Sequence, residues 1–295
     1  MNKRICEKAV AVSKLARAHF SSLMYGVVPS KVKGPGFEYI DLRDYSIGDD
    51  LRYIDWRASA RMIKPDGDYR LMVKEFLLER MVNIVIILDY TSSMNYGDKI
   101  ETSIYCLTGL LSIAHSLGDV VDLVIMKGSK PYLEYALDPL DAINIALNNI
   151  CSSDPSGDHD LTKLTGLLDK LKNRESVFLI TDYCHYPIEL DVLLTRLSVL
   201  NTGFGAVFIT TDFELKPPSV GGYFVFIDTE KPGRVIDMNI RDYYREVSKH
   251  IYRVKSILDR KRVDYIEVNG LNQAKIKKLH LLRLYTITRI RRRKT

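Results

Sequence analysis

Short, almost uninterrupted apolar runs alternate along this chain with longer amphipathic stretches, and this alternation restricts the possible fold more than any other feature. The clearest run is "VNIVIILD" (82–89), and apolar residues recur at helical spacing after it, at Ile100, Ile104, Leu107 and Leu111. Strands that are apolar on both faces are typical of a parallel sheet covered by helices on both sides. Further strands are expected at 120–127, 132–137 (an edge strand), 176–182, 205–210, 223–228 and 265–268. The pattern therefore predicts a doubly wound, mostly parallel α/β domain.

Three parts of the chain are distinguished by pattern and charge. We expect an N-terminal module of a helix and short strands over 1–80, the α/β domain over 81–270, and a basic C-terminal helix or tail over 271–295. The last part holds nine Lys or Arg residues and no acidic ones, which leaves 34 basic against 37 acidic residues in the rest, a net charge of −3. Such a tail is either a solvated terminus or a binding element for nucleic acid or anionic lipid.

The cysteines are widely separated and form no C-x-x-C pair, so the sequence predicts neither a disulfide framework nor a zinc site. They are Cys6, Cys106, Cys151 and Cys184. No apolar stretch reaches the roughly 18–20 uncharged residues that a membrane helix needs. Charged residues interrupt the first twenty positions, unlike the apolar region of a signal peptide. We therefore expect a soluble, cytoplasmic protein.

Polar residues follow two of the predicted strands at the point where each strand ends. Asp89 closes the strand at 82–89 and is followed by Thr91 and Ser93, and Asp182 closes the strand at 176–182. If these strands are neighbours, the carboxylates emerge at the same edge of the sheet, where ligands bind in such folds. Carboxylate and hydroxyl oxygens are ligands for Mg²⁺ or Mn²⁺. The alternative is a structural turn or helix cap, a common role for Asp and Ser after a strand.

The stretch "DYTSS" resembles the D-x-S-x-S signature of von Willebrand factor A domains, which carry a metal-ion-dependent adhesion site. A second stretch, "GPGFEYIDLRDYSIGDDLRYIDWRASAR", resembles the domain-of-unknown-function 58 family, whose members pair this segment with a von Willebrand A-like domain. The matching residues are Gly36, Glu38, Arg43, Tyr45, Gly48, Asp49, Asp50, Arg52, Ile54, Asp55, Trp56, Ala60 and Arg61. The resemblance extends from about residue 31 to residue 270.

This resemblance implies one divalent ion, Mg²⁺ or Mn²⁺, held by Asp89, Thr91, Ser93, a threonine from a further loop, and Asp182. Thr162 in "GDHDLTKLTGLL" fits the threonine best, and Thr165 is the alternative. The family usually has a glycine before this threonine, and here the preceding residue is leucine. The resemblance also implies a partner, because family members often occur beside MoxR-type AAA+ ATPases and are thought to act as adaptors in the assembly of protein complexes.

The segment "RDYSIGDDLRYIDW" and its flanks bring arginines and aspartates close together in sequence. The planar guanidinium favours paired contacts with a carboxylate, so one interpretation is an internal ion-pair network with the single tryptophan as an anchor. The other interpretation is a charged contact surface for a partner. The residues concerned are Arg43, Asp49, Asp50, Arg52, Asp55, Trp56 and Arg61.

Three functions are compatible with these patterns. The first is a non-enzymatic adaptor whose bound ion accepts a carboxylate from a partner protein. The second is a Mg²⁺-dependent phosphohydrolase, but enzymes with an aspartyl nucleophile typically need a second carboxylate two residues later, where this chain has Thr91. The third is a nucleic-acid or membrane-surface binder acting through the C-terminal tail. We expect the first.

Overall fold

The computed structural model describes residues 3–27, 38–45, 54–62, 71–77, 81–128, 131–158, 160–168, 174–216, 221–227 and 235–290. The chain forms two compact units, one of residues 1–28 and 81–295 and the other of residues 29–80. The first unit contains a six-stranded sheet in the order β10-β7-β6-β3-β4-β5. Its strands are β3 (Asn83–Asp89), β4 (Val120–Met126), β5 (Tyr132–Leu137), β6 (Ser176–Thr181), β7 (Gly203–Thr210) and β10 (Asp264–Asn269).

Every neighbouring pair in this sheet is parallel except β4 with β5, which pair antiparallel at one edge. Successive side chains of a strand point to opposite faces, and both faces of β3 are buried. Ile84, Ile86 and Leu88 enter one core cluster, whereas Val85 and Ile87 enter the other. The prediction of a doubly wound, mostly parallel α/β domain is confirmed.

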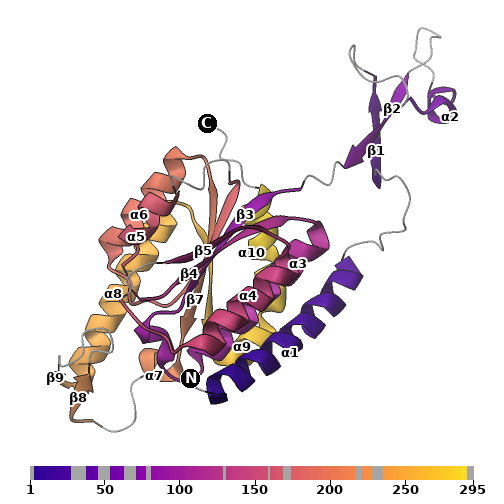
Figure 1. The fold of residues 1–295 in the computed structure, drawn as a ribbon. Helices are drawn as coiled ribbons and strands as arrows, with labels where there is room; N and C mark the ends of the chain where they lie inside the picture. Colours follow the sequence, from indigo (N-terminus) through magenta and orange to yellow (C-terminus); the bar gives the residue numbers. More distant parts are fainter. Residues whose placement is uncertain are drawn as a thin grey trace. The chain divides into compact units, whose positions relative to one another are not determined.

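Helices cover both faces of the sheet (Figure 1). One layer is formed by α1 (Lys3–Val27), α3 (Lys99–Leu117), α4 (Pro139–Ser152), α9 (Gly270–Ile276) and α10 (Lys278–Ile290). The other is formed by α5 (Thr162–Leu168), α6 (Pro187–Val199) and α8 (Ile240–Arg260). The short elements η2 (Ser92–Asn95) and α7 (Asp212–Leu215) follow the carboxyl ends of β3 and β7.

The expected strand at 223–228 forms, but not in the central sheet. It is β8 (Tyr223–Ile227), which pairs antiparallel with β9 (Val235–Asn239) in a separate two-stranded ribbon. In the second unit, β1 (Glu38–Asp44) pairs antiparallel with β2 (Met72–Leu77), and α2 (Trp56–Ser59) lies between them in sequence.

The unit boundaries correct the expected division of the chain at both ends. Helix α1 was expected in the N-terminal module, yet it belongs to the α/β unit, where Ala9, Ala16 and Phe20 are buried against α3. The expected tail is largely a packed part of the same unit, because α10 buries Leu281 and Tyr285. The apolar faces of both helices need a partner surface, which α3 and α4 supply for α1, and α3 with strands β7 and β10 for α10. Residues 291–295 of the tail lie outside the described residues.

The contact between α1 and α3 depends on one glycine. A Cβ placed on Gly109 of α3 would lie 2.5 Å from Cε2 of Phe20, which is fully buried. Gly109→Ala should therefore lower the free energy of unfolding by about 1–3 kcal/mol, because the ring must move within a packed core. Gly166→Ala in α5 is the matched control, since nothing lies within 4 Å of its added Cβ. It should be neutral or raise the unfolding free energy by up to about 1 kcal/mol. Urea unfolding of both variants tests this, and equal effects would contradict it.

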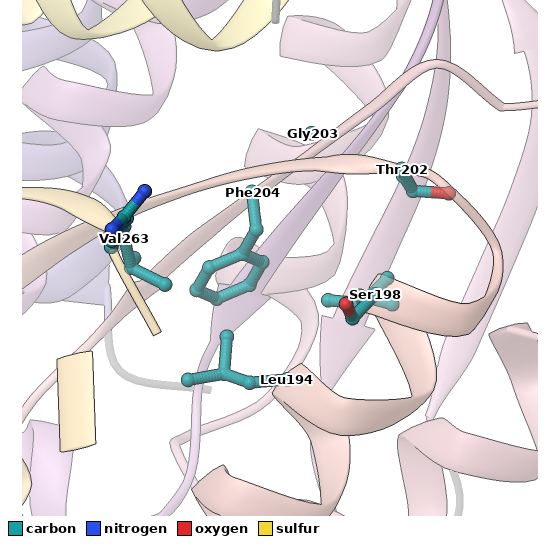
Figure 2. A pocket seen from close by; sticks show the side chains of 8 residues that line it. Leu194, Ser198, Thr202, Gly203, Phe204 and Val263 are labelled. Atoms are coloured by element: carbon teal, nitrogen blue, oxygen red, sulfur yellow. The ribbon is translucent and has the colours of Figure 1, made fainter. Parts of the chain in front are cut away.

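A small cavity lies at the amino end of β7, between α6 and the segment that leads into β10 (Figure 2). Its volume is about 20 Å³, and Phe204 lies beside Leu194 and Val263 in its lining. A space of this size holds one or two water molecules at most. It is also at the opposite end of the strands from Asp89 and Asp182, so it is not the candidate functional site.

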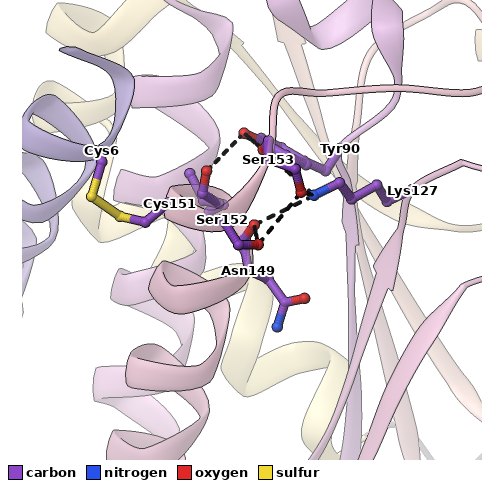
Figure 3. The surroundings of a disulfide bond; sticks show 8 residues. Cys6, Tyr90, Lys127, Asn149, Cys151, Ser152 and Ser153 are labelled. Atoms are coloured by element: carbon purple, nitrogen blue, oxygen red, sulfur yellow. Dashed lines mark hydrogen bonds between the residues drawn. A yellow bond between two sulfur atoms is a disulfide. The ribbon is translucent and has the colours of Figure 1, made fainter. Parts of the chain in front are cut away.

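A disulfide joins Cys6 of α1 to Cys151 of α4 (Figure 3). The sequence predicted no disulfide framework, and this single disulfide was not expected. The two residues are 145 positions apart, and only the packing of α1 on the α/β unit brings them together. Their sequence spacing could not show this. Cys106 is a free, buried thiol and Cys184 a free thiol beside Asp182.

None of the described helices combines the length and the apolar composition that a membrane span requires. The cytoplasmic location stays a prediction, and disulfides in that compartment are usually transient or regulatory.

Candidate functional site

Asp89 and Asp182 lie at the point where the strand order of the sheet reverses. Counted in chain order within the sheet, the strands run 3-2-1-4-5-6, and the first and fourth strands are β3 and β6. Leu88 pairs with Ile180, so Asp89 at the end of β3 is level with Thr181, and Asp182 follows directly. Crevices at such reversals, outside the carboxyl ends of the strands, are the usual ligand sites of open α/β sheets.

Three of the predicted ligands gather in one turn after β3. The backbone N–H and the hydroxyl of Thr91 donate to Oδ1 of Asp89 at 3.0 and 2.7 Å, and Oγ1 of Thr91 lies 3.3 Å from Oγ of Ser93. An aspartate side chain that accepts a hydrogen bond from the N–H two residues later forms a common type of turn. The 3-10 helix η2 follows this turn and contains Ser93. All three residues are buried. The turn thus presents three oxygen atoms of hard-ligand type close to one another.

The second oxygen of Asp89 faces β6 and the loop after it. Oδ2 accepts a hydrogen bond from Oγ1 of Thr181 at 2.6 Å and lies 3.3 Å from Nε2 of His185. Thr181 also contacts His185 directly. Both Asp89 oxygens therefore have protein partners, as the alternative interpretation of a structural turn expects. A carboxylate oxygen has more than one lone pair, so these bonds leave room for a further contact.

The other predicted carboxylate is paired with a lysine. Nζ of Lys99, in the first turn of α3, lies 2.8 Å from Oδ2 of Asp182 and 2.5 Å from Oε1 of Glu214 in α7. It also lies 3.5 Å from the carbonyl oxygen of Ser93, and the N–H of Cys184 donates to Oδ1 of Asp182 at 2.9 Å. The side chains of Lys99 and Asp182 are each only 1% exposed.

This pairing shifts the protonation equilibria of both partners. Burial alone would lower the pKa of Lys99, but the neighbouring charges, led by Asp182, raise it above its ordinary value. Burial alone would raise the pKa of Asp182, but the charge and hydrogen bond of Lys99 lower it below its ordinary value. Both groups are therefore charged at neutral pH.

The donor chemistry at Asp89 suits a hard divalent ion. Lys99 pairs with Asp182 and Glu214, whereas Asp89 accepts a hydrogen bond from Thr181 and lies 3.3 Å from His185. The described residues contain no group of three or more His, Cys, Asp or Glu placed to hold a metal. An ion would thus depend on hydroxyl oxygens, and Asp89, Thr91 and Ser93 are the residues that fit it.

The threonine expected from the further loop is not joined to this cluster. Thr162 begins α5 and is exposed, and its hydroxyl donates to Oδ1 of Asp160 at 2.5 Å. The hydroxyl of Thr165 donates to the carbonyl of Thr162 at 2.6 Å. Among the hydrogen bonds of the described residues, neither threonine contacts Asp89, Thr91 or Ser93, and the choice between them stays a prediction.

The arginine and aspartate segment lies in the other unit and is described only in part. Asp55 caps α2, with Oδ1 accepting from the N–H of Ala58 at 3.0 Å. Trp56 begins α2 and is exposed, and the interpretation of its indole as an anchor stays a prediction. Arg61 is also exposed, and Arg43 lies in β1. Asp49, Asp50 and Arg52 lie outside the described residues, and the ion-pair network stays a prediction.

Four residues of the site were missed by reasoning from the sequence. They are Lys99, Thr181, His185 and Glu214. Lys99 had a signal that could have been used, because a lysine in the first turn of a helix faces the positive end of the helix dipole and needs a nearby carboxylate. Glu214 lies 115 residues further along the chain, and no local pattern connects the two.

The sheet order, the antiparallel edge strand and the polar turn after the first strand define a doubly wound α/β domain of the von Willebrand A-like type. The model of the family described as "Protein of unknown function DUF58" matches residues 41–254, and the chain belongs to this family. The expected family is therefore confirmed. A search of curated proteins gave no significant match.

Solved structures with a similar fold have low sequence identity to this chain. An aerotolerance-related membrane protein from Bacteroides fragilis NCTC 9343, carrying multiple mutations to serine, is 13% identical with a TM-score of 0.43, covering 70% of this chain and 99% of its own. Protein BatB from Bacteroides thetaiotaomicron is 14% identical with a TM-score of 0.40 and the same coverages. The SpRpn10 VWA domain is 10% identical with a TM-score of 0.42, covering 68% and 94%. These similarities are too distant to indicate a function.

Proposed function

We propose that this chain is a non-enzymatic protein-interaction module that holds Mg²⁺ or Mn²⁺ at Asp89, Thr91 and Ser93 and binds a carboxylate of a partner through that ion. The observation that carries the proposal is the gathering of these three oxygen donors, 2.7 and 3.3 Å apart, at the reversal point of the sheet. The von Willebrand A-like fold and the DUF58 family support an interaction role. We also propose Asp182 and Thr162 as ligands of the ion, either by direct contact or through a bound water molecule.

The ion's chemistry explains why a carboxylate is the expected partner group. Mg²⁺ prefers six oxygen ligands and keeps water at positions that the protein does not fill. Asp89 supplies one negative charge, so a divalent ion there retains positive charge that an Asp or Glu of another protein can neutralise. Binding of the metal ion would then increase the affinity of this chain for an acidic partner protein.

The arrangement of Thr181, His185 and Asp89 does not favour an enzyme, although a hydroxyl, an imidazole and a carboxylate are in contact. The hydroxyl of Thr181 is fully buried, and it donates its hydrogen bond to Asp89. It is therefore not arranged as a nucleophile whose proton a histidine base removes. Lys99 and Asp182 are likewise engaged with each other inside the protein. These side chains hold the edge of the sheet together, and the proposed function needs no chemistry from them.

The partner we propose is a MoxR-type AAA+ ATPase, with which the chain would act in the cytoplasm in the assembly or maturation of protein complexes. This part of the proposal is supported by the family alone.

Binding to the purified ATPase encoded in the same genome tests this function. We expect binding to the immobilised wild-type chain in 5 mM Mg²⁺, and at least about tenfold weaker binding in EDTA or with Asp89→Ala, because the ion bridges the two proteins. Lys216→Ala is the control, since Lys216 is exposed and pairs with Asp212 outside the cluster. Equal binding with and without the ion would contradict the proposed mechanism.

A further inference from the structure

Lys99 is the one described side chain that contacts three separate elements of the candidate site. Its ammonium lies between the end of β6 at Asp182, the helix α7 at Glu214 and the carbonyl of Ser93 in η2. An ammonium has three N–H donors, and these three partners account for all of them. Lys99 is therefore a fixed internal cation whose hydrogen-bonding capacity is fully used.

Its position determines what Asp182 can do. Oδ2 of Asp182 accepts from Lys99, and Oδ1 accepts from the N–H of Cys184 at 2.9 Å. Glu214 is held as well, because Oε1 is bound to Lys99 while Oε2 accepts from the N–H and hydroxyl of Thr211 at 2.8 and 3.0 Å. Asp182 and Glu214 thus share one internal cation, which contacts Asp89 in none of the described ion pairs.

We propose that Lys99 is the resident cation of this site and that it competes with a divalent ion for Asp182 and Glu214. This inference rests on the proposed function, because it concerns the same ion. With Lys99 in place, an ion beside Asp89, Thr91 and Ser93 has one protein carboxylate as a charged ligand. Affinity for divalent ions rises with the number of charged ligands, so the ion alone is held weakly. A partner's carboxylate then supplies the second charge, which couples ion binding to partner binding.

Removal of the Lys99 charge tests the competition directly. Lys99→Met and Lys99→Gln release Asp182 and Glu214, so Mg²⁺ alone should bind at least about tenfold more tightly than to the wild type, as expected for added charged ligands. The gain should disappear when Asp182→Asn is added. Lys249→Met is the matched control, because Lys249 lies in α8, outside the candidate site, and pairs with Glu246 at the protein surface. Its Mg²⁺ affinity should equal that of the wild type.

Two measurements report Mg²⁺ binding without a partner protein, and both can be interpreted even if the Lys99 variants are less stable than the wild type. Calorimetry gives the affinity for Mg²⁺, and thermal unfolding with and without 10 mM Mg²⁺ gives the stabilisation by the ion, which should be larger for both Lys99 variants than for the wild type. If the wild type binds Mg²⁺ and the Lys99 variants bind it equally or more weakly, the competition is refuted while the proposed function stands. If the Lys99 variants bind Mg²⁺ and the wild type does not, the competition is supported. The prediction that the isolated wild-type chain binds the ion is then wrong. If no protein binds, both are refuted.

Discussion

Asp119→Ala should lower the free energy of unfolding by about 3–5 kcal/mol, because it leaves the partly buried guanidinium of Arg289 without the counter-charge of Asp119. Asp119 is 2% exposed, and Arg289 of α10 donates to both of its oxygens, from Nε at 2.8 Å and from Nη2 at 2.9 Å. The hydroxyl of Tyr285 and the N–H of Val82 donate to the same carboxylate at 2.7 and 3.0 Å. One side chain thus joins the C-terminal helix to the start of the central strand.

Tyr285→Phe is a milder change to the same network and is compared with Asp119→Ala. It removes one hydrogen bond to Asp119 and keeps the ion pair and the buried ring, which stacks on Phe178. We expect a loss of about 0.5–1.5 kcal/mol in urea unfolding. Similar small losses for both variants would show that the basic C-terminal helix is held by its apolar face alone.

Lys99→Met should lower the free energy of unfolding by a similar amount, about 3–5 kcal/mol at pH 7 in the presence of EDTA. The ammonium is buried, and its removal leaves the charges of Asp182 and Glu214 close together without a cation. Lys249→Met should cost less than about 1 kcal/mol, because the ion pair of Lys249 with Glu246 in α8 is exposed to solvent. Equal losses for the two variants in urea unfolding would contradict the assigned role of Lys99.

The pH dependence of the Lys99→Met effect follows from the two pKa shifts. The pKa of Asp182 is lowered from 3.8, so its contribution is present above that value and is lost as the pH falls through the folded-state pKa. The pKa of Lys99 is raised from 10.5, so its contribution is complete below that value and is lost as the pH rises through the folded-state pKa. The difference in stability between wild type and variant should therefore be constant from about pH 5 to 9 and shrink below about pH 4.

Much of the fold was predictable because its determinants are local. The strands at 82–89 and 176–182 have uninterrupted apolar centres, and such runs are buried on both faces of a parallel sheet. The position of α1 was not predictable, because its apolar stripe indicates burial without indicating the surface that buries it. The disulfide between Cys6 and Cys151 depends on that same docking and was missed for the same reason.

The candidate site likewise has a part that could be predicted from local sequence and a part that depends on packing. Asp89, Thr91 and Ser93 lie within five positions of one another, so the turn that gathers them could be predicted from their spacing. Asp182 was correctly placed at the same edge, since it ends the neighbouring strand. The pairing of Lys99 with Asp182 and Glu214 depends on where α3 and α7 begin relative to the sheet, which is a property of the packed domain. The sequence therefore indicated the carboxylates of Asp89 and Asp182, but neither Glu214 nor the lysine that pairs with both Asp182 and Glu214.

Titration of Mg²⁺ into the wild-type chain and into Asp89→Ala, followed by calorimetry at high protein concentration, tests the central claim most directly. We predict one weak site in the wild type, with a dissociation constant on the order of 10⁻⁴–10⁻³ M, and no binding to the variant, because Asp89 is the ion's principal charged ligand. Identical titrations of the two proteins would contradict the claim, because Asp89 would then contribute nothing to ion binding.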